Sequence, residues 1–242
     1  MKITVFNGSP WHEEGHTHIM SQEFVVGAIK GGAKVQIIHL ASKLIKPCTR
    51  CGACFYKTPG KCALDDDMTY LIDKFVKSDF VIFATPVYID NITGIMKSFI
   101  DRLMPVFDPH YEKDSNGEHR RRLRYKKLPG FIIMSSCAFP EQSHFQVLQL
   151  FFQRMARSMH TEVIGEICRT AGGLLLLSKE EIKFRPAVEA YKKRLRFTGE
   201  EFARTGRITM AMEKELQQPL IDNEEYVLYA NKMWDQILPN SS

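Results

Sequence analysis

Five short apolar segments alternate with segments of helical periodicity in the first 168 residues. The predicted strands are residues 2–7, 34–40, 80–85, 130–136 and 162–168. The predicted helices, in which apolar residues recur every three or four positions, are residues 17–30, 66–77, 94–104 and 144–159. Repeated strand–helix units with short connections predict right-handed crossovers and a parallel sheet between two helical layers.

Two segments do not fit this alternation. Residues 105–128 contain prolines, an Asn-Gly pair and a basic run, and they predict a long loop. Residues 179–242 predict a helical extension that packs on the sheet domain or on a second subunit. Its expected inner contacts are Tyr191, Leu195 and Phe202 in one helix, and Tyr226, Tyr229, Met233, Trp234 and Ile237 in another. The predicted fold class is therefore α/β: a flavodoxin-like, doubly wound, five-stranded parallel sheet in residues 1–178, followed by a helical extension in residues 179–242.

The composition excludes several classes of protein. The chain has 242 residues, of which 44% are hydrophobic and 25% charged, as in an ordinary globular domain. No apolar run approaches the ~18 residues of a membrane span, and the first residues predict a strand and a loop rather than a signal peptide. The net charge of +5 comes largely from residues 119–127, where neither a reading helix nor an aromatic platform accompanies it. We expect a cytoplasmic protein that binds neither membrane nor nucleic acid.

Charged residues elsewhere have simpler expected roles. The basic residues of the 119–127 run are expected in a solvated loop, although they could also receive a phosphate of NADPH or steer an acidic partner. They are Arg120, Arg121, Arg122, Arg124, Lys126 and Lys127. Residues 65–67, all Asp, are expected to favour the start of the next helix through its dipole rather than to bind a cation. Asp101 and Arg102 are expected to form a structural pair.

Four cysteines, two or seven residues apart, form the most unusual motif of the chain. They are Cys48, Cys51, Cys54 and Cys62. Because cytosolic thiols stay reduced, a metal or redox role is favoured over disulfides. Two-residue gaps allow one loop to supply three ligands of a [4Fe–4S] cluster, with a more distant cysteine as the fourth. Zinc usually takes two CxxC pairs further apart. The pattern favours the cluster over zinc and leaves unmetallated thiols open, whereas Cys137 and Cys168 are expected to be buried small residues.

The predicted ligand site lies beyond the carboxyl ends of the strands, in the loops of residues 8–17, 86–93 and 135–141. The first, GSPWHEEGHT, combines turn-forming glycines with two hydroxyls at the start of a helix, a pattern that suits a phosphate. It lacks the Walker and dinucleotide-binding patterns, so a plain loop with a hydroxyl cap remains an alternative. In the second loop Pro86 and Tyr88 could receive a planar ring, or the loop is an ordinary turn capped by Asn91 or Thr93.

Together these motifs resemble a known family. The stretches are GSPxxxxGxT, the cysteine segment ending KTPGKC, DDM, and TPVYxxxxxGxxKxFIDR. They resemble the NADPH-dependent FMN reductase family, particularly its iron–sulfur flavoprotein branch, over about residues 1–160. The resemblance implies a flavodoxin-like fold with noncovalently bound FMN.

The resemblance also implies which residues contact the cofactors. Ser9, Trp11, His16 and Thr17 would surround the phosphate; Pro86, Val87, Tyr88 and Asn91 would line the isoalloxazine and ribityl chain; Ser136 and Cys137 would approach the other side of the flavin. Many relatives carry a basic residue at the position of Trp11 and Asn or Ser at that of His16. The phosphate is therefore expected to be held by amides and hydroxyls more than by a cation.

The leading functional hypothesis is an FMN-dependent oxidoreductase. It takes hydride from NAD(P)H and passes electrons to a quinone, another flavin or a protein acceptor, and a [4Fe–4S] cluster would divide the transfer into one-electron steps. No catalytic side chain is named, because the flavin carries the chemistry. The alternatives are a flavodoxin-like electron carrier without nicotinamide turnover and a redox or metal sensor that uses the thiols. A homodimer or higher homo-oligomer is expected, since one subunit would leave the flavin face open.

Overall fold

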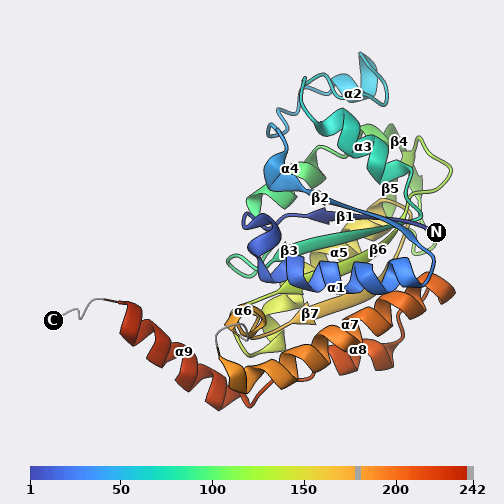
Figure 1. Ribbon diagram of the computed structural model, residues 1–242. Helices are drawn as coiled ribbons and strands as arrows, with labels where there is room; N and C mark the ends of the chain where they lie inside the picture. Colours follow the sequence, from blue (N-terminus) through green and yellow to red (C-terminus); the bar gives the residue numbers. More distant parts are fainter. Residues whose placement is uncertain (178–180, 239–242) are drawn as a thin grey trace.

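Five parallel strands form the centre of the computed structural model, which describes residues 1–177 and 181–238 (Figure 1). They are β1 (Lys2–Asn7), β2 (Lys34–His39), β3 (Phe80–Pro86), β6 (Gly130–Ser136) and β7 (Val163–Arg169). Their order in the sheet is β2-β1-β3-β6-β7. This is a doubly wound order, in which successive strands are added toward one edge of the sheet up to β2 and toward the other edge from β3 onward. The predicted fold class is confirmed, whereas the boundary between residues 178 and 179 lies outside the described residues.

Helices cover both faces of the sheet. One face carries α1 (His16–Lys30) and α7 (Arg185–Thr205), and the other carries α3 (Met68–Val76), α4 (Gly94–Asp101) and α5 (Gln146–Ser158). The remaining helices are α2 (Ala53–Tyr56), α6 (Leu174–Leu177), α8 (Met210–Gln217) and α9 (Asn223–Ile237). Single 3-10 turns are η1 (His12–Glu14), η2 (Leu40–Ser42), η3 (Met104–Val106), η4 (Gln142–Phe145) and η5 (Ile182–Phe184). Within the two described ranges, no helix combines the length and apolarity that crossing a membrane requires.

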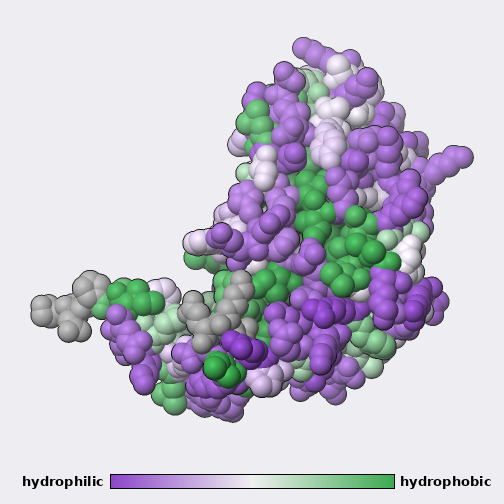
Figure 2. Space-filling model, in the orientation of Figure 1, coloured by the Kyte–Doolittle hydropathy of each residue, from purple (hydrophilic) through white to green (hydrophobic). Residues whose placement is uncertain are grey.

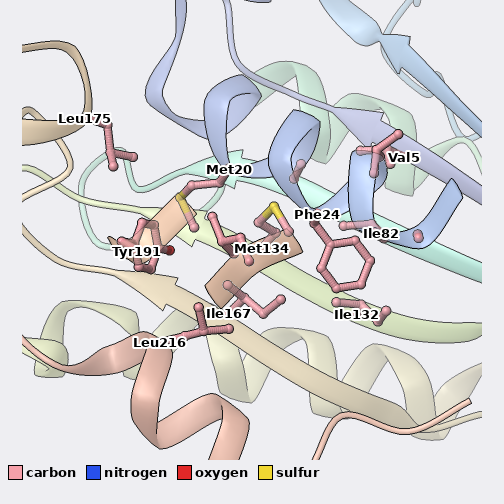
Figure 3. Close-up of a cluster of buried hydrophobic side chains, with 14 of the residues drawn as sticks. Val5, Met20, Phe24, Ile82, Ile132, Met134, Ile167, Leu175, Tyr191 and Leu216 are labelled. Atoms are coloured by element: carbon pink, nitrogen blue, oxygen red, sulfur yellow. The ribbon is translucent and has the colours of Figure 1, made fainter. Parts of the chain in front are cut away.

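Successive strand residues point to opposite faces, so the near-continuous apolar strands feed two cores. Figure 3 shows the core on the side of α1 and α7, where strand residues such as Val5 and Ile132 meet Phe24 and Tyr191. On the other face Phe6, Phe83 and Phe131 pack against α3, α4 and α5. All of these side chains are fully buried.

The first helix of the extension packs tightly against the sheet domain. A Cβ at Gly27 of α1 would lie 1.8 Å from the carbonyl oxygen of Arg196, and a Cβ at Gly199 of α7 would lie 2.1 Å from that of Phe24. The two helices are therefore in backbone contact at glycines. The predicted inner residues of this helix, Tyr191, Leu195 and Phe202, are fully buried, which confirms that prediction.

The last helix, α9, buries only part of the apolar face that the sequence predicts. It projects from the body of the molecule (Figure 1), and Figure 2 shows apolar residues at its outer end. Tyr226 is buried, but the side chains of Trp234 and Ile237 are 51% and 60% exposed. The single chain therefore does not bury these two residues, and their packing on a second subunit stays a prediction. The periodicity of the sequence predicts the position of this helix. It does not indicate whether the surface that covers the apolar face belongs to the same chain or to another.

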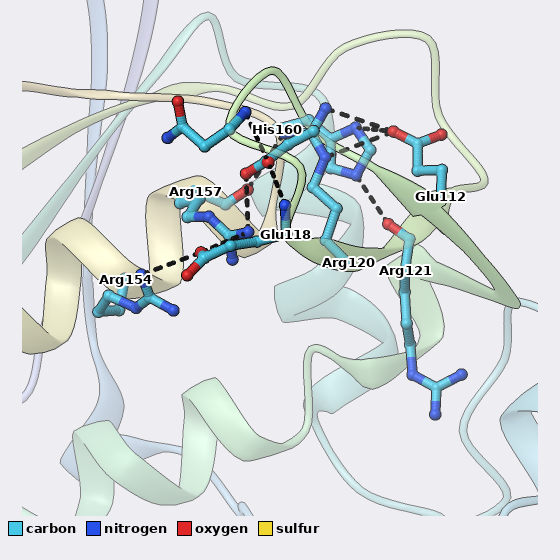
Figure 4. A network of polar contacts seen from close by, with 9 residues as sticks. Glu112, Glu118, Arg120, Arg121, Arg154, Arg157 and His160 are labelled. Atoms are coloured by element: carbon cyan, nitrogen blue, oxygen red, sulfur yellow. Dashed lines mark hydrogen bonds and ion pairs between the residues drawn. The ribbon is translucent and has the colours of Figure 1, made fainter.

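Residues 105–128 are more ordered than the predicted loop. They contain an antiparallel hairpin of β4 (Phe107–Lys113) and β5 (His119–Leu123), with Gly117 at a φ of 78° in the turn. Figure 4 shows how acidic residues of the hairpin hold it against α5 and the residues that follow. Arg157 lies 2.7 Å from carboxylate oxygens of both Asp114 and Glu118.

The basic run is also less free than expected. Arg120 pairs with Glu112 across the hairpin, and the guanidinium of Arg121 stacks on the rings of Tyr111 and Phe55. The expectation of a solvated loop is wrong for these two arginines, because β-pairing and local partners order their backbone and side chains.

Candidate functional site

Loops at the carboxyl ends of β1, β3 and β6 meet in one cleft of about 370 Å³, which we call the strand-end cleft. It is lined by Ser9, Trp11, Glu14, Gly15, His16, Thr17, Pro86, Val87, Tyr88, Ser136, Cys137, Ala138 and Leu176. Nine of the ten side chains predicted to bind flavin are among these residues. The tenth, Asn91, lies outside the lining and instead exchanges backbone hydrogen bonds with Tyr88.

The first loop presents backbone donors at the start of α1. Asn7 accepts the backbone N–H of Ser9 (2.8 Å), and Ser9 Oγ accepts that of Trp11 (3.3 Å), which shapes the loop. Gly15 is the N-cap of α1, and no side chain caps the helix. A Cβ at Gly15 would lie 2.6 Å from Ser9 Oγ, so any larger residue here would displace the Ser9 side chain. The uncapped first turn of a fifteen-residue helix favours an anion through its N–H groups and its dipole.

The three loops are hydrogen-bonded to one another. The backbone N–H of Val87 donates to the carbonyl of Ser136 (2.9 Å), and the hydroxyls of Thr17 and Ser136 lie 3.3 Å apart. Thr93 donates its hydroxyl to the carbonyl of Gly8 (2.8 Å) and also caps α4, which was one of the two caps considered in the alternative interpretation of this loop. These bonds hold the walls of the cleft in one arrangement before any ligand binds.

The second loop contains a strained turn. Ile89 and Asp90 both have left-handed φ angles, 48° and 55°, between the paired residues Tyr88 and Asn91. Such a φ is unusual for a β-branched residue, and the side chain of Ile89 is 97% exposed. Strain of this kind gathers at functional sites, and here it places a tight turn at the mouth of the cleft.

The titratable groups at the cleft favour neutral forms. Burial lowers the pKa of His16 below its usual 6.5. Burial also raises the pKa of the Cys137 thiol to about 11. At neutral pH both side chains are uncharged, so they suit contact with a neutral ring or hydrogen bonding to a phosphate better than charge pairing.

Sequence reasoning missed some residues of this site. Ala138 and Leu176 line the cleft, and Tyr226 of α9 donates its hydroxyl to the carbonyl of Ala138 (2.6 Å). Tyr226 follows Ala138 by 88 residues, and no pattern in the sequence indicates this contact. Glu14 also lines the cleft, and nothing in the sequence marks it, whereas Gly15 is the second glycine of the predicted phosphate loop.

All four cysteines of the 48–62 segment line a second, smaller pocket of about 80 Å³. Cys48 and Cys51 are exposed, Cys54 and Cys62 are half-buried, and all four are free thiols. Burial raises the pKa of Cys54, and the neighbouring Cys62 raises it further. Across residues 1–177 and 181–238, no three His, Cys, Asp or Glu side chains already stand as a set of metal ligands.

A buried ion pair lies beside this pocket. Arg102 binds both carboxylate oxygens of Asp66, at 2.7 and 2.9 Å. The expected pair of Asp101 with Arg102 is wrong: Asp101 pairs with Lys97 on the exposed side of α4. Side chains at adjacent helical positions point about 100° apart, so Arg102 is turned inward while Asp101 faces solvent.

The acidic run meets the start of α3 and also has a role that was not expected. Burial would raise the pKa of Asp66, but hydrogen bonds from Arg102, Lys46 and Met68 bring it below its usual value. Asp67 is the N-cap of α3 without a side-chain cap bond, and its carboxylate instead accepts the N–H of Leu44 (2.8 Å). These carboxylates chiefly fasten the chain before the cysteines, in addition to meeting the start of α3.

Comparison with known proteins agrees with this architecture. An iron-sulfur flavoprotein of Archaeoglobus fulgidus is 34% identical over 142 residues, which is 59% of this chain and 58% of that protein. One from Methanocaldococcus jannaschii is 32% identical over 106 residues, which is 44% of this chain and 53% of that protein. The chain thus spans about half the length of these curated relatives.

A solved structure has the same fold. The FMN-dependent NADH-azoreductase of Bacillus anthracis, in complex with FMN, superimposes with a TM-score of 0.60 at 10% identity, over 84% of this chain and 99% of that one. At 10% identity this similarity shows the fold alone. The model of the family described as NADPH-dependent FMN reductase matches residues 1–167. Because that match covers more than half of the sequence, the chain belongs to the NADPH-dependent FMN reductase family.

Proposed function

We propose that the chain is an NAD(P)H-dependent oxidoreductase that binds FMN in the strand-end cleft. The observation that carries this proposal is the convergence of three strand-end loops on the uncapped start of α1. The first loop offers amides and the Ser9 and Thr17 hydroxyls to the phosphate. Pro86–Tyr88 and Ser136–Ala138, which leave neighbouring strands, would contact the ring. Bound FMN would supply the hydride and single-electron chemistry.

The residues of the cleft fit this group. Trp11 is 65% and Tyr88 46% exposed, so large aromatic surfaces stand at the mouth where a planar ring would enter. The uncharged Cys137 and His16 place no charge against it. The chain's contribution is to bind and orient the ring and to leave one side open to nicotinamide and acceptor. A quinone, a flavin or a protein is the proposed acceptor.

The thiol segment supports a [4Fe–4S] cluster as a second cofactor. Four free cysteines face one pocket, which supplies the four-thiolate donor set of such clusters. The relatives from Archaeoglobus fulgidus and Methanocaldococcus jannaschii are named iron-sulfur flavoproteins. The cluster would carry single electrons, and the loop would hold it at the surface within reach of a partner.

A homo-oligomer is part of the proposal. Apolar side chains stand exposed beside the strand-end cleft, where Ile89 is 97% and Phe139 53% exposed, and α9 adds Trp234 and Ile237. A second subunit would cover such surface. Light scattering of the purified chain should give at least twice the mass of 27.9 kDa, and a strict monomer would count against this part.

Anaerobic titration tests the main proposal. The purified chain should bind FMN with one site, and NADPH should bleach its absorbance near ~450 nm within seconds. A Gly15→Val variant, whose side chain would meet Ser9, should bind FMN at least about tenfold more weakly, whereas Gly94→Ala, with open space around its Cβ, should match wild type. Bound FMN that is reduced by a ferredoxin but not by NADPH would favour an electron carrier. A chain that refuses FMN but binds zinc would favour a sensor.

A further inference from the structure

Arg102 and Asp66 form a buried, bidentate ion pair at the edge of the thiol pocket. Their side chains are 1% and 0% exposed, and the two N–O distances are 2.7 and 2.9 Å. A guanidinium and a carboxylate in this fork geometry bind strongly and with a fixed orientation. A buried charge left without its partner is strongly unfavourable, so loss of either member should open this part of the structure.

The pair holds together the two ends of the cysteine segment. Arg102 Nη1 donates to the carbonyl of Lys46 (2.6 Å), two residues before Cys48. The backbone N–H of Lys46 donates to Asp66 (3.0 Å), four residues after Cys62. Entry and exit of the segment therefore meet at one guanidinium–carboxylate pair.

A second set of bonds runs alongside. The N–H of Leu44 donates to Asp67 Oδ2 (2.8 Å), and the N–H of Asp67 donates to the carbonyl of Leu44 (3.1 Å). Lys46 Nζ donates to the carbonyl of Asp65 (3.0 Å). Most of these groups are exposed, so hydrogen bonds to water can take the place of the bonds between them. The Arg102–Asp66 pair is buried, so water does not reach its hydrogen bonds.

Arg102 also contacts the ligand set itself. It lines the thiol pocket together with all four cysteines. Arg102 is the C-cap of α4, and the N-cap of that helix, Thr93, is bonded to Gly8 beside the strand-end cleft. One eight-residue helix, about 12 Å long, thus fixes the position of the thiol pocket relative to the sheet.

We propose that Arg102 and Asp66 are positioning residues that close the cysteine segment, so that its four thiols line one pocket before a metal centre forms. The part that concerns the cluster rests on the proposed function, and the closure of the segment does not. The pair joins the two ends of the segment from inside the fold, and Arg102 lines the pocket that the four thiols share.

Hydrogen exchange on the iron-free chain tests the closure. The variants are Asp66→Asn, which keeps the shape and removes the charge, and Arg102→Lys, which keeps the charge and removes the fork. Asp73→Asn is the matched control, because Asp73 pairs with Lys77 at 2.6 Å on the exposed surface of α3. Amides of residues 44–46 and 65–67 should exchange about a hundredfold faster in both variants and at the wild-type rate in the control.

Amides of β1 and β3 report in the same experiment whether the sheet stays folded. If the β1 and β3 amides also exchange faster in Arg102→Lys, that variant is unfolded, and the test then depends on Asp66→Asn alone. Wild-type exchange at residues 44–46 and 65–67 in Asp66→Asn would overturn the proposal.

Anaerobic reconstitution with ferrous iron and sulfide tests the consequence for the thiols. Wild type and Asp73→Asn should retain iron against a chelator at least about tenfold longer than Asp66→Asn and Arg102→Lys. Equal retention in all four proteins would refute a positioning role toward the cluster. A wild-type chain that takes up no iron, or no FMN, would instead refute the corresponding part of the proposed function, and the exchange experiment would still decide whether the pair closes the segment.

Discussion

A methyl group at Gly27 should separate α7 from α1. The new Cβ would lie 1.8 Å from the carbonyl oxygen of Arg196, and ordinary contact begins near 3.4 Å, so the helices must part by about 1.6 Å at this point. A gap of ~1 Å forfeits a quarter to a half of a dispersion contact. Four buried side chains of α7 contribute ~2 kcal/mol each, and losing a quarter to a half of that stabilisation costs about 2–4 kcal/mol. They are Val188, Tyr191, Leu195 and Phe202. The helix propensity of Ala returns ~1 kcal/mol, which leaves about 1–3 kcal/mol of destabilisation.

Thermal unfolding followed by circular dichroism measures this effect. For a chain of this size Gly27→Ala should lower Tm by about 3–10 °C. Gly94→Ala is the control, since nothing lies within 4 Å of its Cβ, and it should leave Tm unchanged or slightly raised. A Tm of Gly27→Ala equal to that of wild type would show that the backbone contact between α1 and α7 is not part of the stable fold. The extension would then not pack as a layer of the domain.

Three further predictions concern the strand-end cleft and its surroundings. Thr17→Val, which keeps the shape but removes the hydroxyl near Ser136, should weaken FMN binding by about five- to tenfold in a fluorescence titration, and unchanged affinity would remove Thr17 from the phosphate site. Tyr226→Phe, which removes the bond to the loop of Ala138, should lower the free energy of unfolding by about 1 kcal/mol in urea, and a stability equal to wild type would show that the bond is not formed in solution. Burial lowers the pKa of His18 and His39 in the folded chain, so the unfolded chain takes up protons first; stability should be full above pH 6.5 and should fall as pH drops through 6.5 toward the lower folded values. The urea midpoint should therefore be lower at about pH 5.5 than at about pH 7.5, His39→Gln should reduce that difference, and an equal difference in the variant would refute the assignment.

The order of strands and helices was determined by the sequence itself. Apolar runs such as residues 80–85 are typical of strands in a parallel sheet that is covered on both faces, and the helical periodicity between them predicts short right-handed crossovers. Strand-end loops then meet at one edge by geometry, which is why nine of the ten predicted flavin-site residues line the same cleft. These hydrophobic patterns are local, so each strand or helix can be predicted from its own segment of the sequence.

Tertiary structure alone decided what distant segments do to one another. Arg102 pairs with Asp66 rather than with its neighbour Asp101, because the choice depends on which side of α4 is buried. Trp234 and Ile237 form an apolar face on α9, but the other described residues of the single chain leave these two side chains more than half exposed. Pairing of the basic run in β5 with β4 likewise depends on acidic partners and rings brought close by folding. A sequence specifies the chemical character of each face, whereas the partner of that face is set by the packing of the whole chain.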